Sequence, residues 1–184
     1  YWIREDTSKW SLVDAPGFLR IYSSPYETNG KTKNRLIRHI TVEDFMITTH
    51  VLFEPKTNFQ FAGLTIYQDD NNFISLGRAF CDTPNACIGN GIYFDNVVDG
   101  TWTGNNFATL VLTPNEAYLR LECRGNMVKA FFSYDGLSWI EIGSHTLKPG
   151  FLVNGMGLVV SGDIDKSDED IPADFDYFVL SELE

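Results

Sequence analysis

Residues 118–132, with the sequence YLRLECRGNMVKAFF, decide the fold class of the chain. Apolar and polar residues alternate along 118–123, which is the pattern of a β-strand with one buried face. The Arg-Gly-Asn sequence at 124–126 supplies a turn, and a second apolar run follows at 127–132. We therefore expect two antiparallel strands joined in a hairpin.

The same signals recur along the chain, whereas helical periodicity is nearly absent. Turn sequences join residues 64–67 to 73–76 and residues 127–132 to 139–142, so two further hairpins are expected. Other strand-like runs lie at 18–22, 45–53, 151–160 and 175–180. About a dozen short strands are too many for a small barrel, whereas a sandwich buries one face of each. We predict an all-β, antiparallel, two-sheet jelly-roll sandwich that forms a single domain over residues 1–184.

Charge and hydropathy exclude several classes of partner. The 184 residues include 25 acidic and 14 basic side chains, which give a formal net charge of −11. Nucleic-acid binding depends on Lys and Arg side chains that neutralise phosphates, so we expect no nucleic-acid partner. No apolar run approaches the ~20 residues of a membrane-spanning helix, so we expect no membrane partner. Because the chain begins with Tyr1 and carries no signal-peptide pattern, we expect an excerpt of a larger protein or a processed product.

The three cysteines are too few for a disulfide framework. Cys81 and Cys87 bracket the loop sequence CDTPNAC, in which Pro and Asn favour a turn. If the protein is secreted, a local disulfide and two free thiols are equal alternatives there. Cys123 lies in an alternating run, and we expect a buried thiol at that position.

An acidic segment near the C-terminus has two interpretations. Asp163 and Asp165 have the alternate spacing of an oxygen-donor loop, and Asp174 falls at the twelfth position. Asp168, however, stands where such a loop needs glycine, so the pattern is incomplete. A weak calcium site formed by Asp163, Asp165, Asp168 and Asp174 is one interpretation. A solvated acidic loop without a metal is the other, and we favour it.

The sequence contains no pattern of catalytic residues. A glycosidase of this fold class would place carboxylates at alternate positions of one strand, and no such Glu-x-Asp run is present. The three histidines are scattered, with no nucleophile motif near them. We therefore expect a protein that is not itself an enzyme.

Aromatic side chains are the remaining means of recognition. The apolar face of a sugar ring stacks on an indole or phenol ring, while polar side chains bind its hydroxyl groups. Trp2 and Trp102 lie near polar or turn-rich segments and are suited to this role. Trp139 follows a turn at Asp135 and Gly136, and we expect it to pack on the sheet.

Several runs, taken together and in order, resemble a known module. They are WIRED at 2–6, residues 10–12 and 16–21, residues 33–36, residues 60–72 with Gly77 and Arg78, and residues 173–178. This pattern resembles the concanavalin A-like sandwich at the C-terminus of family 43 glycoside hydrolases, the β-xylosidases and arabinofuranosidases, and in related extracellular proteins of the DUF1349 type. The resemblance covers essentially the whole chain. It implies a secreted or extracellular module that is either carbohydrate-binding or accessory, has no active site of its own and is linked covalently to a catalytic domain.

The matched polar positions and the two tryptophans give eight candidate carbohydrate-binding residues: Trp2, Arg4, Glu5, Gln60, Tyr67, Asp70, Arg78 and Trp102. A bidentate Arg, or a carboxylate that faces neighbouring hydroxyls, suits sugar recognition. In the structural alternative, Arg4, Glu5 and Arg78 form a salt-bridged seam beside the first strand.

Three functions follow from these observations. The leading hypothesis is a non-catalytic module that binds a plant or microbial polysaccharide or oligosaccharide of the xylan, arabinoxylan, arabinan or fructan type. The second is a structural domain that packs on a covalently linked glycoside hydrolase domain. The least favoured is a small glycosidase or polysaccharide lyase with carboxylates from different strands. Structural calcium is the only cofactor that the sequence suggests.

Overall fold

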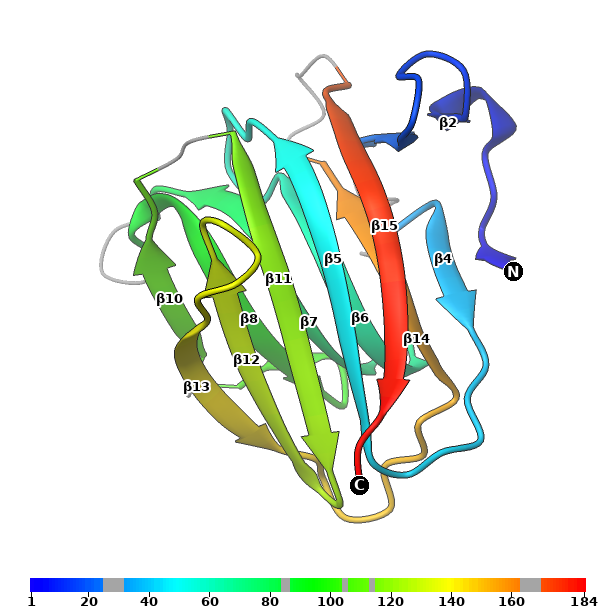
Figure 1. The fold of residues 1–184 in the computed structure, drawn as a ribbon, viewed down its shortest axis with the longest axis vertical. Helices are drawn as coiled ribbons and strands as arrows, with labels where there is room; N and C mark the ends of the chain where they lie inside the picture. Colours follow the sequence, from blue (N-terminus) through cyan, green and yellow to red (C-terminus); the bar gives the residue numbers. More distant parts are fainter. Residues whose placement is uncertain (25–31, 84–86, 104–105, 113–114, 163–169) are drawn as a thin grey trace.

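The computed structural model describes residues 1–24, 32–83, 87–103, 106–112, 115–162 and 170–184. These residues form two antiparallel β-sheets that pack face to face (Figure 1). Their helical content is one 3-10 turn, η1 (Thr7–Lys9), and none of the described segments forms a helix that could cross a membrane. The predicted all-β sandwich is therefore confirmed.

The first sheet has eight strands in the order β1-β4-β14-β6-β7-β8-β10, with β9 paired to β8. Its strands are β1 (Trp2–Ile3), β4 (Arg35–Arg38), β6 (Phe61–Asp69), β7 (Asn72–Cys81), β8 (Gly89–Val98), β9 (Thr101–Trp102), β10 (Phe107–Leu110) and β14 (Gly155–Ser161).

The second sheet has seven strands in the order β13-β12-β11-β5-β15-β3-β2 and lies in front in Figure 1. Its strands are β2 (Trp10–Ser11), β3 (Leu19–Tyr22), β5 (Phe45–Phe53), β11 (Glu116–Arg124), β12 (Met127–Ser133), β13 (Ile140–Thr146) and β15 (Pro172–Glu182).

The predicted hairpins are confirmed as the pairs β6–β7, β11–β12 and β12–β13. Two strand boundaries differ from expectation. The run predicted at 151–160 becomes a strand only at Gly155, because the backbone before it turns and Asn154 donates its N–H to the carbonyl of Tyr67. Strand β15 begins earlier than predicted, at Pro172, where it pairs with Tyr22 of β3.

Alternate residues of each strand fill the interior between the sheets. In the first sheet, Leu64, Leu76 and Phe94 lie in one cross-strand row and are fully buried. In the second sheet, Ile47 and Leu121 face each other across β5 and β11 and are also buried. Each such side chain contributes about 1.5–3 kcal/mol when it leaves water. The intervening residues point outward, so each sheet also presents an outer face.

The sequence left the pairing of Cys81 with Cys87 open and predicted a buried thiol at Cys123. Cys81 and Cys87 form a disulfide, which decides between the two alternatives. Cys81 packs with Phe61 and Tyr93 on the outer face of the eight-stranded sheet. Cys123 is a buried free thiol, and burial, together with the charge of Asp44, raises its pKa to about 11.

Strands β6 and β7 approach closely at a pair of glycines. Gly63 lies opposite Gly77 on the outer face of the eight-stranded sheet. A Cβ atom added at Gly63 would lie 2.1 Å from the carbonyl oxygen of Leu76 and 2.5 Å from Cα of Gly77, both of them backbone atoms. The backbone cannot rotate away from such a contact as a side chain can.

We expect Gly63→Ala to lower the free energy of unfolding by about 3 kcal/mol or more, because the two central strands must separate to admit the methyl group. Urea denaturation would measure the loss. Ser144→Ala, at an exposed position of β13, is the control and should change the free energy by less than about 0.5 kcal/mol. A loss at Gly63 no larger than at Ser144 would contradict the close approach.

Candidate functional site

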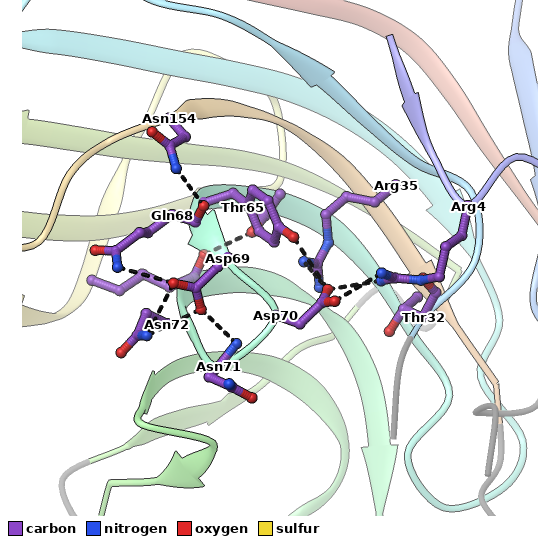
Figure 2. Close-up of polar contacts among 12 residues, drawn as sticks. Arg4, Thr32, Arg35, Thr65, Gln68, Asp69, Asp70, Asn71, Asn72 and Asn154 are labelled. Atoms are coloured by element: carbon purple, nitrogen blue, oxygen red, sulfur yellow. Dashed lines mark hydrogen bonds and ion pairs between the residues drawn. The ribbon is translucent and has the colours of Figure 1, made fainter. Parts of the chain in front are cut away.

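An ion-pair cluster joins the N-terminal segment to the β6–β7 turn (Figure 2). Arg4 donates two hydrogen bonds to Asp70, from Nη1 to Oδ2 and from Nη2 to Oδ1, each 2.8 Å long. The Nε group of Arg4 donates to the carbonyl of Thr32 at 2.9 Å. Arg4 has a left-handed backbone with φ of +53°, which costs about 1–3 kcal/mol for a residue with a side chain. The bidentate pair therefore holds Arg4 in a conformation that it would not otherwise favour.

Arg35 extends the cluster from strand β4. Its Cζ atom lies 4.6 Å from the ring centre of Tyr67 and 4.9 Å from that of Phe73, so the guanidinium group packs against both rings. Its Nη1 atom is 3.8 Å from Oδ1 of Asp70, the oxygen that also accepts the hydroxyl of Tyr67 at 3.2 Å. Asp70 thus forms ion pairs with Arg4 and Arg35 and accepts a hydrogen bond from Tyr67.

The protonation states follow from this arrangement. Burial by itself would raise the pKa of Asp70, but the hydrogen bonds and charge of Arg4 and the charge of Arg35 lower it below its usual value. Burial, with the adjacent carboxylate, raises the pKa of Tyr67. Asp70 is therefore ionised and Tyr67 neutral near pH 7.

The neighbouring carboxylate, Asp69, points the other way and locks the turn (Figure 2). It accepts the backbone N–H of Asn71 at 2.8 Å and hydrogen bonds from the side chains of Asn72 and Gln68. Asn72 in turn accepts the backbone N–H of Asp99 at 3.0 Å, which ties the β6–β7 turn to the β8–β9 turn. The backbone around Asp70 is consequently fixed by its neighbours.

Trp102 lies on the same outer face as this cluster. The strand register places Tyr67, Phe73, Val97 and Trp102 in one cross-strand row. The Trp102 ring meets the Phe73 ring edge-on, with ring centres 6.4 Å apart, and 53% of the residue remains exposed. It is the accessible end of a row whose other end is packed beneath Arg35.

Asp95, on β8, lies one row away, opposite Ser75. Burial raises its pKa to about 7, and the hydrogen bond that Trp102 offers only partly opposes this effect. Near neutral pH the carboxyl group is thus poised between its protonated and ionised forms. An exposed indole beside a carboxyl group suits hydroxyl-rich ligands, because the ring offers an apolar face and the carboxyl group hydrogen bonds.

The structure brings together four of the eight predicted residues: Arg4, Tyr67, Asp70 and Trp102. Two others support the N-terminal segment, where Trp2 stacks on Trp10 with ring centres 5.2 Å apart and Glu5 accepts the indole N–H of Trp10 at 3.1 Å. The alternative of a salt-bridged seam formed by Arg4, Glu5 and Arg78 is not what the structure shows, because Arg4 pairs with Asp70 and Glu5 binds Trp10.

Gln60 and Arg78 are removed from the candidate set by their burial. The side-chain oxygen of Gln60 accepts the backbone N–H groups of Lys56 and Thr57, which closes the loop before β6. Arg78 has no exposed surface and occupies the interior row between Ala62 and Ile92, where burial lowers its pKa to about 10. A ligand outside the sandwich cannot reach either side chain.

The calcium interpretation rests mainly on residues outside the described ranges, since Asp163, Asp165 and Asp168 lie there. Asp174 belongs to β15 and accepts two hydrogen bonds from Arg20, at 2.6 and 2.7 Å. Within the described residues, no three His, Cys, Asp or Glu side chains are grouped closely enough to hold a metal.

Three members of this face were not predicted: Arg35, Phe73 and Asp95. Arg35 lay within the run 33–36 that carried the family resemblance, and Phe73 directly follows the turn at 68–72. Asp95 has no local signal, because a single polar residue in a strand is the ordinary pattern of an exposed face.

Comparisons with known proteins agree with this architecture. The family model described as "Beta xylosidase C-terminal Concanavalin A-like domain" matches residues 1–181. A xylan 1,3-beta-xylosidase from a Vibrio species is 28% identical over 151 residues, which cover 77% of this chain and 26% of that enzyme. A family 43 glycoside hydrolase from Bacillus licheniformis shares the fold, with a TM-score of 0.81 and 19% identity over 97% of this chain and 35% of its own.

A functionally unknown protein from Saccharomyces cerevisiae also has this fold, with a TM-score of 0.75 and 12% identity. The match covers all of this chain and 96% of the yeast chain. This chain therefore matches nearly the whole of the yeast protein but spans only 35% of the Bacillus protein and 26% of the Vibrio protein.

We expect Asp70→Asn to lower the free energy of unfolding by about 1–2 kcal/mol, because an amide cannot neutralise Arg4 and Arg35 and the pair is only partly screened by solvent. Chemical denaturation at pH 7 would measure the change. Glu141→Gln breaks an exposed ion pair with Lys129 and is the control, with an expected loss below about 0.5 kcal/mol. Equal losses in the free energy of unfolding for the two substitutions would contradict a stabilising role for the Arg4–Asp70 pair.

Asp95 should make stability depend on pH in the direction opposite to most carboxylates. Its folded-state pKa of about 7 exceeds the ordinary value of 3.8, so the folded state holds a proton that the unfolded state releases between these values. Stability due to this group is therefore lost as pH rises from about 4 to about 7. We expect the stability of Asp95→Asn relative to wild type to rise by roughly 2–3 kcal/mol from pH 5 to pH 8.

Unfolding curves of wild type and variant across that pH range would measure this gain. Asp99→Asn, at an exposed carboxylate that pairs with Lys148, is the matched control and should show no such trend. A constant difference between wild type and Asp95→Asn at every pH would mean that Asp95 is ionised throughout.

Proposed function

Because the chain belongs to the family of beta xylosidase C-terminal concanavalin A-like domains, we propose that it is a carbohydrate-binding module that holds a neutral polysaccharide of the xylan type. Domains of this family are non-catalytic C-terminal parts of family 43 glycoside hydrolases, and the catalytic domain is not part of this chain. Its contribution to a whole enzyme would be to keep substrate close.

The observation that carries the proposal is the half-exposed Trp102 ring beside the carboxyl group of Asp95. The indole is already held against Phe73, so its side chain loses little conformational entropy when a sugar ring stacks on it. The entropic cost that opposes binding is therefore small. The Arg4–Asp70 clamp supports this face from its other end and is saturated by its own contacts, so we assign it a structural role.

The net charge of the chain and the Vibrio relative indicate the class of carbohydrate that it would bind. A net charge of −11 disfavours acidic glycans, which leaves neutral ones. The Vibrio relative is a xylan 1,3-beta-xylosidase, which favours xylan over arabinan or fructan. We also propose an extracellular location, which the Cys81–Cys87 disulfide supports because such bonds persist in oxidising compartments.

A second function, docking on a linked catalytic domain, is favoured by one observation. Leu12 and Val13 are adjacent, lie between β2 and β3, and are 63% and 80% exposed. Two neighbouring apolar side chains in water suit a protein interface. This role would need no affinity for glycan.

We expect the isolated chain to be retarded in native gels that contain xylan or arabinoxylan, and Trp102→Ala to weaken binding about tenfold or more, because the stacking surface is lost. Gels with arabinan, levan and β-glucan test the other polymers. Leu112→Ala, which also removes an exposed apolar side chain, is the control and should leave retardation unchanged.

The gels also separate the two functions. Retardation that is unaffected by Trp102→Ala would mean that the glycan-binding site lies elsewhere than on the face that carries Trp102. No retardation by any polymer would favour docking. In that case Leu12→Ser with Val13→Ser should weaken association with a separately produced catalytic domain.

A further inference from the structure

The outer face of the seven-stranded sheet carries a row of polar rings on the side of the molecule opposite Trp102. The register places Tyr118 of β11, His50 of β5 and Tyr177 of β15 directly beside one another. The rings of His50 and Tyr118 stack with centres 4.1 Å apart and planes 8° apart. Because side chains stand roughly perpendicular to a sheet, stacked rings present their polar edges outward.

Carboxylates flank this row on both sides. Oε2 of Glu116 lies 3.4 Å from Nε2 of His50, and Oδ2 of Asp176 lies 3.5 Å from Nδ1. Both carboxylate side chains are close to half exposed, at 45% and 48%. Burial, then the nearby Tyr118 and Asp176, raises the pKa of Tyr177, so its hydroxyl stays a hydrogen-bond donor near pH 7. Donors and acceptors therefore converge on one part of the face.

An aromatic platform adjoins the row. Arg120, two residues after Tyr118 on β11, has its Cζ atom 3.8 Å from the ring centre of Trp139. Its Nη1 atom is 3.9 Å from Glu122, and burial lowers its pKa. Trp139 packs on the sheet, as the sequence predicts, but against Arg120 on the outer face. Trp139 is half-buried, and so part of its surface remains accessible.

This face is more polar than packing alone requires. Nε of Arg120 and Nε2 of His50 are buried and form no hydrogen bond within the described part of the chain. Buried polar atoms of this kind destabilise a fold unless something else balances them, and they concentrate where a site must be held for a ligand. Arg120 and His50 stand, with both tyrosines, on the long central strands β5, β11 and β15, which hold them rigidly, and Trp139 lies just before the edge strand β13.

The charges of this face indicate the chemistry of the ligand. Glu116 and Asp176 flank His50, and Glu122 lies beside Arg120, so three carboxylates share this part of the face with the Arg120 guanidinium group. A polyanion would be repelled, and a purely apolar ligand would cover the half-exposed carboxylates and the phenols without offering them hydrogen bonds. A neutral, hydroxyl-rich ligand can both accept from the Tyr and Arg groups and donate to the carboxylates, while its apolar ring face covers Trp139.

We propose that Tyr118, Tyr177, Arg120 and Trp139, flanked by Glu116 and Asp176, form a second contact surface for neutral glycans, on the face opposite Trp102. This inference rests on the proposed carbohydrate-binding function and adds a site to it. The two surfaces lie on opposite sheets, so one short oligosaccharide cannot reach both.

The test uses xylohexaose as the probe and the 184-residue chain in four forms: wild type, Trp102→Ala, Tyr118→Phe with Tyr177→Phe, and the combination. The Phe substitutions keep both rings, including the Tyr118 ring that stacks on His50, and remove only two hydroxyl groups, so the fold is preserved. We expect the double Phe change to weaken binding by the Trp102→Ala protein about threefold to tenfold. Amide chemical shifts should move on β11 and β15 in that protein when xylohexaose is added.

Tyr1→Phe is the matched control, because it removes an exposed hydroxyl at the N-terminal edge beside His39 and should change nothing. If Trp102→Ala abolishes all binding and all shift changes on β11 and β15, the second surface is overturned while the proposed function stands. If wild type binds neither xylohexaose nor any polymer in the gels, the proposed function itself fails. Binding that survives in the Trp102→Ala protein but does not respond to the double Phe change also overturns this assignment.

Discussion

Face-to-face packing of the two sheets is the constraint on which the rest of the structure depends. Each strand turns alternate residues into one shared interior, and rows such as Leu64, Leu76 and Phe94 are withdrawn completely from water. The residues between them point to the two outer faces, because successive side chains of a strand alternate between the faces of a sheet. Polar side chains therefore lie mainly on two surfaces, although Arg78, Thr49 and His145 are buried inside the sandwich.

The eight-stranded sheet must also secure its open edge, where β1 and β4 are short. The Arg4–Asp70 pair does this by joining the N-terminal segment to the β6–β7 turn, and Arg35 covers the rings beneath it. The left-handed backbone at Arg4 is tolerated because three hydrogen bonds from its guanidinium group hold it there. Rigidity at this end gives the Phe73 and Trp102 rings a fixed support.

Sequence patterns predicted what is local and missed what depends on distant partners. Hairpins such as β11–β12 need only an alternating run and a turn, and both are visible in the sequence. Strand β8 was missed, because nearly all of its central residues are buried and alternation is lost. The pairing of Arg4 with Asp70 spans 66 positions, and no local pattern encodes it. Arg78 matched a family position, yet only the strand register shows that it points inward.

The two proposed glycan surfaces are held apart by the interior that they share. Packed sheets are separated by about 10 Å, so ligands on the two outer faces cannot touch, and each face must bind a separate chain or a separate stretch of one. Weak sites arranged in this way gain from being linked, because a polymer bound at one face raises the local concentration of sugar at the other. A short oligosaccharide gains nothing from this linkage. The proposed polysaccharide-binding role would account for hydroxyl-binding groups on both sheets, whereas a receptor for one small sugar would need them on only one.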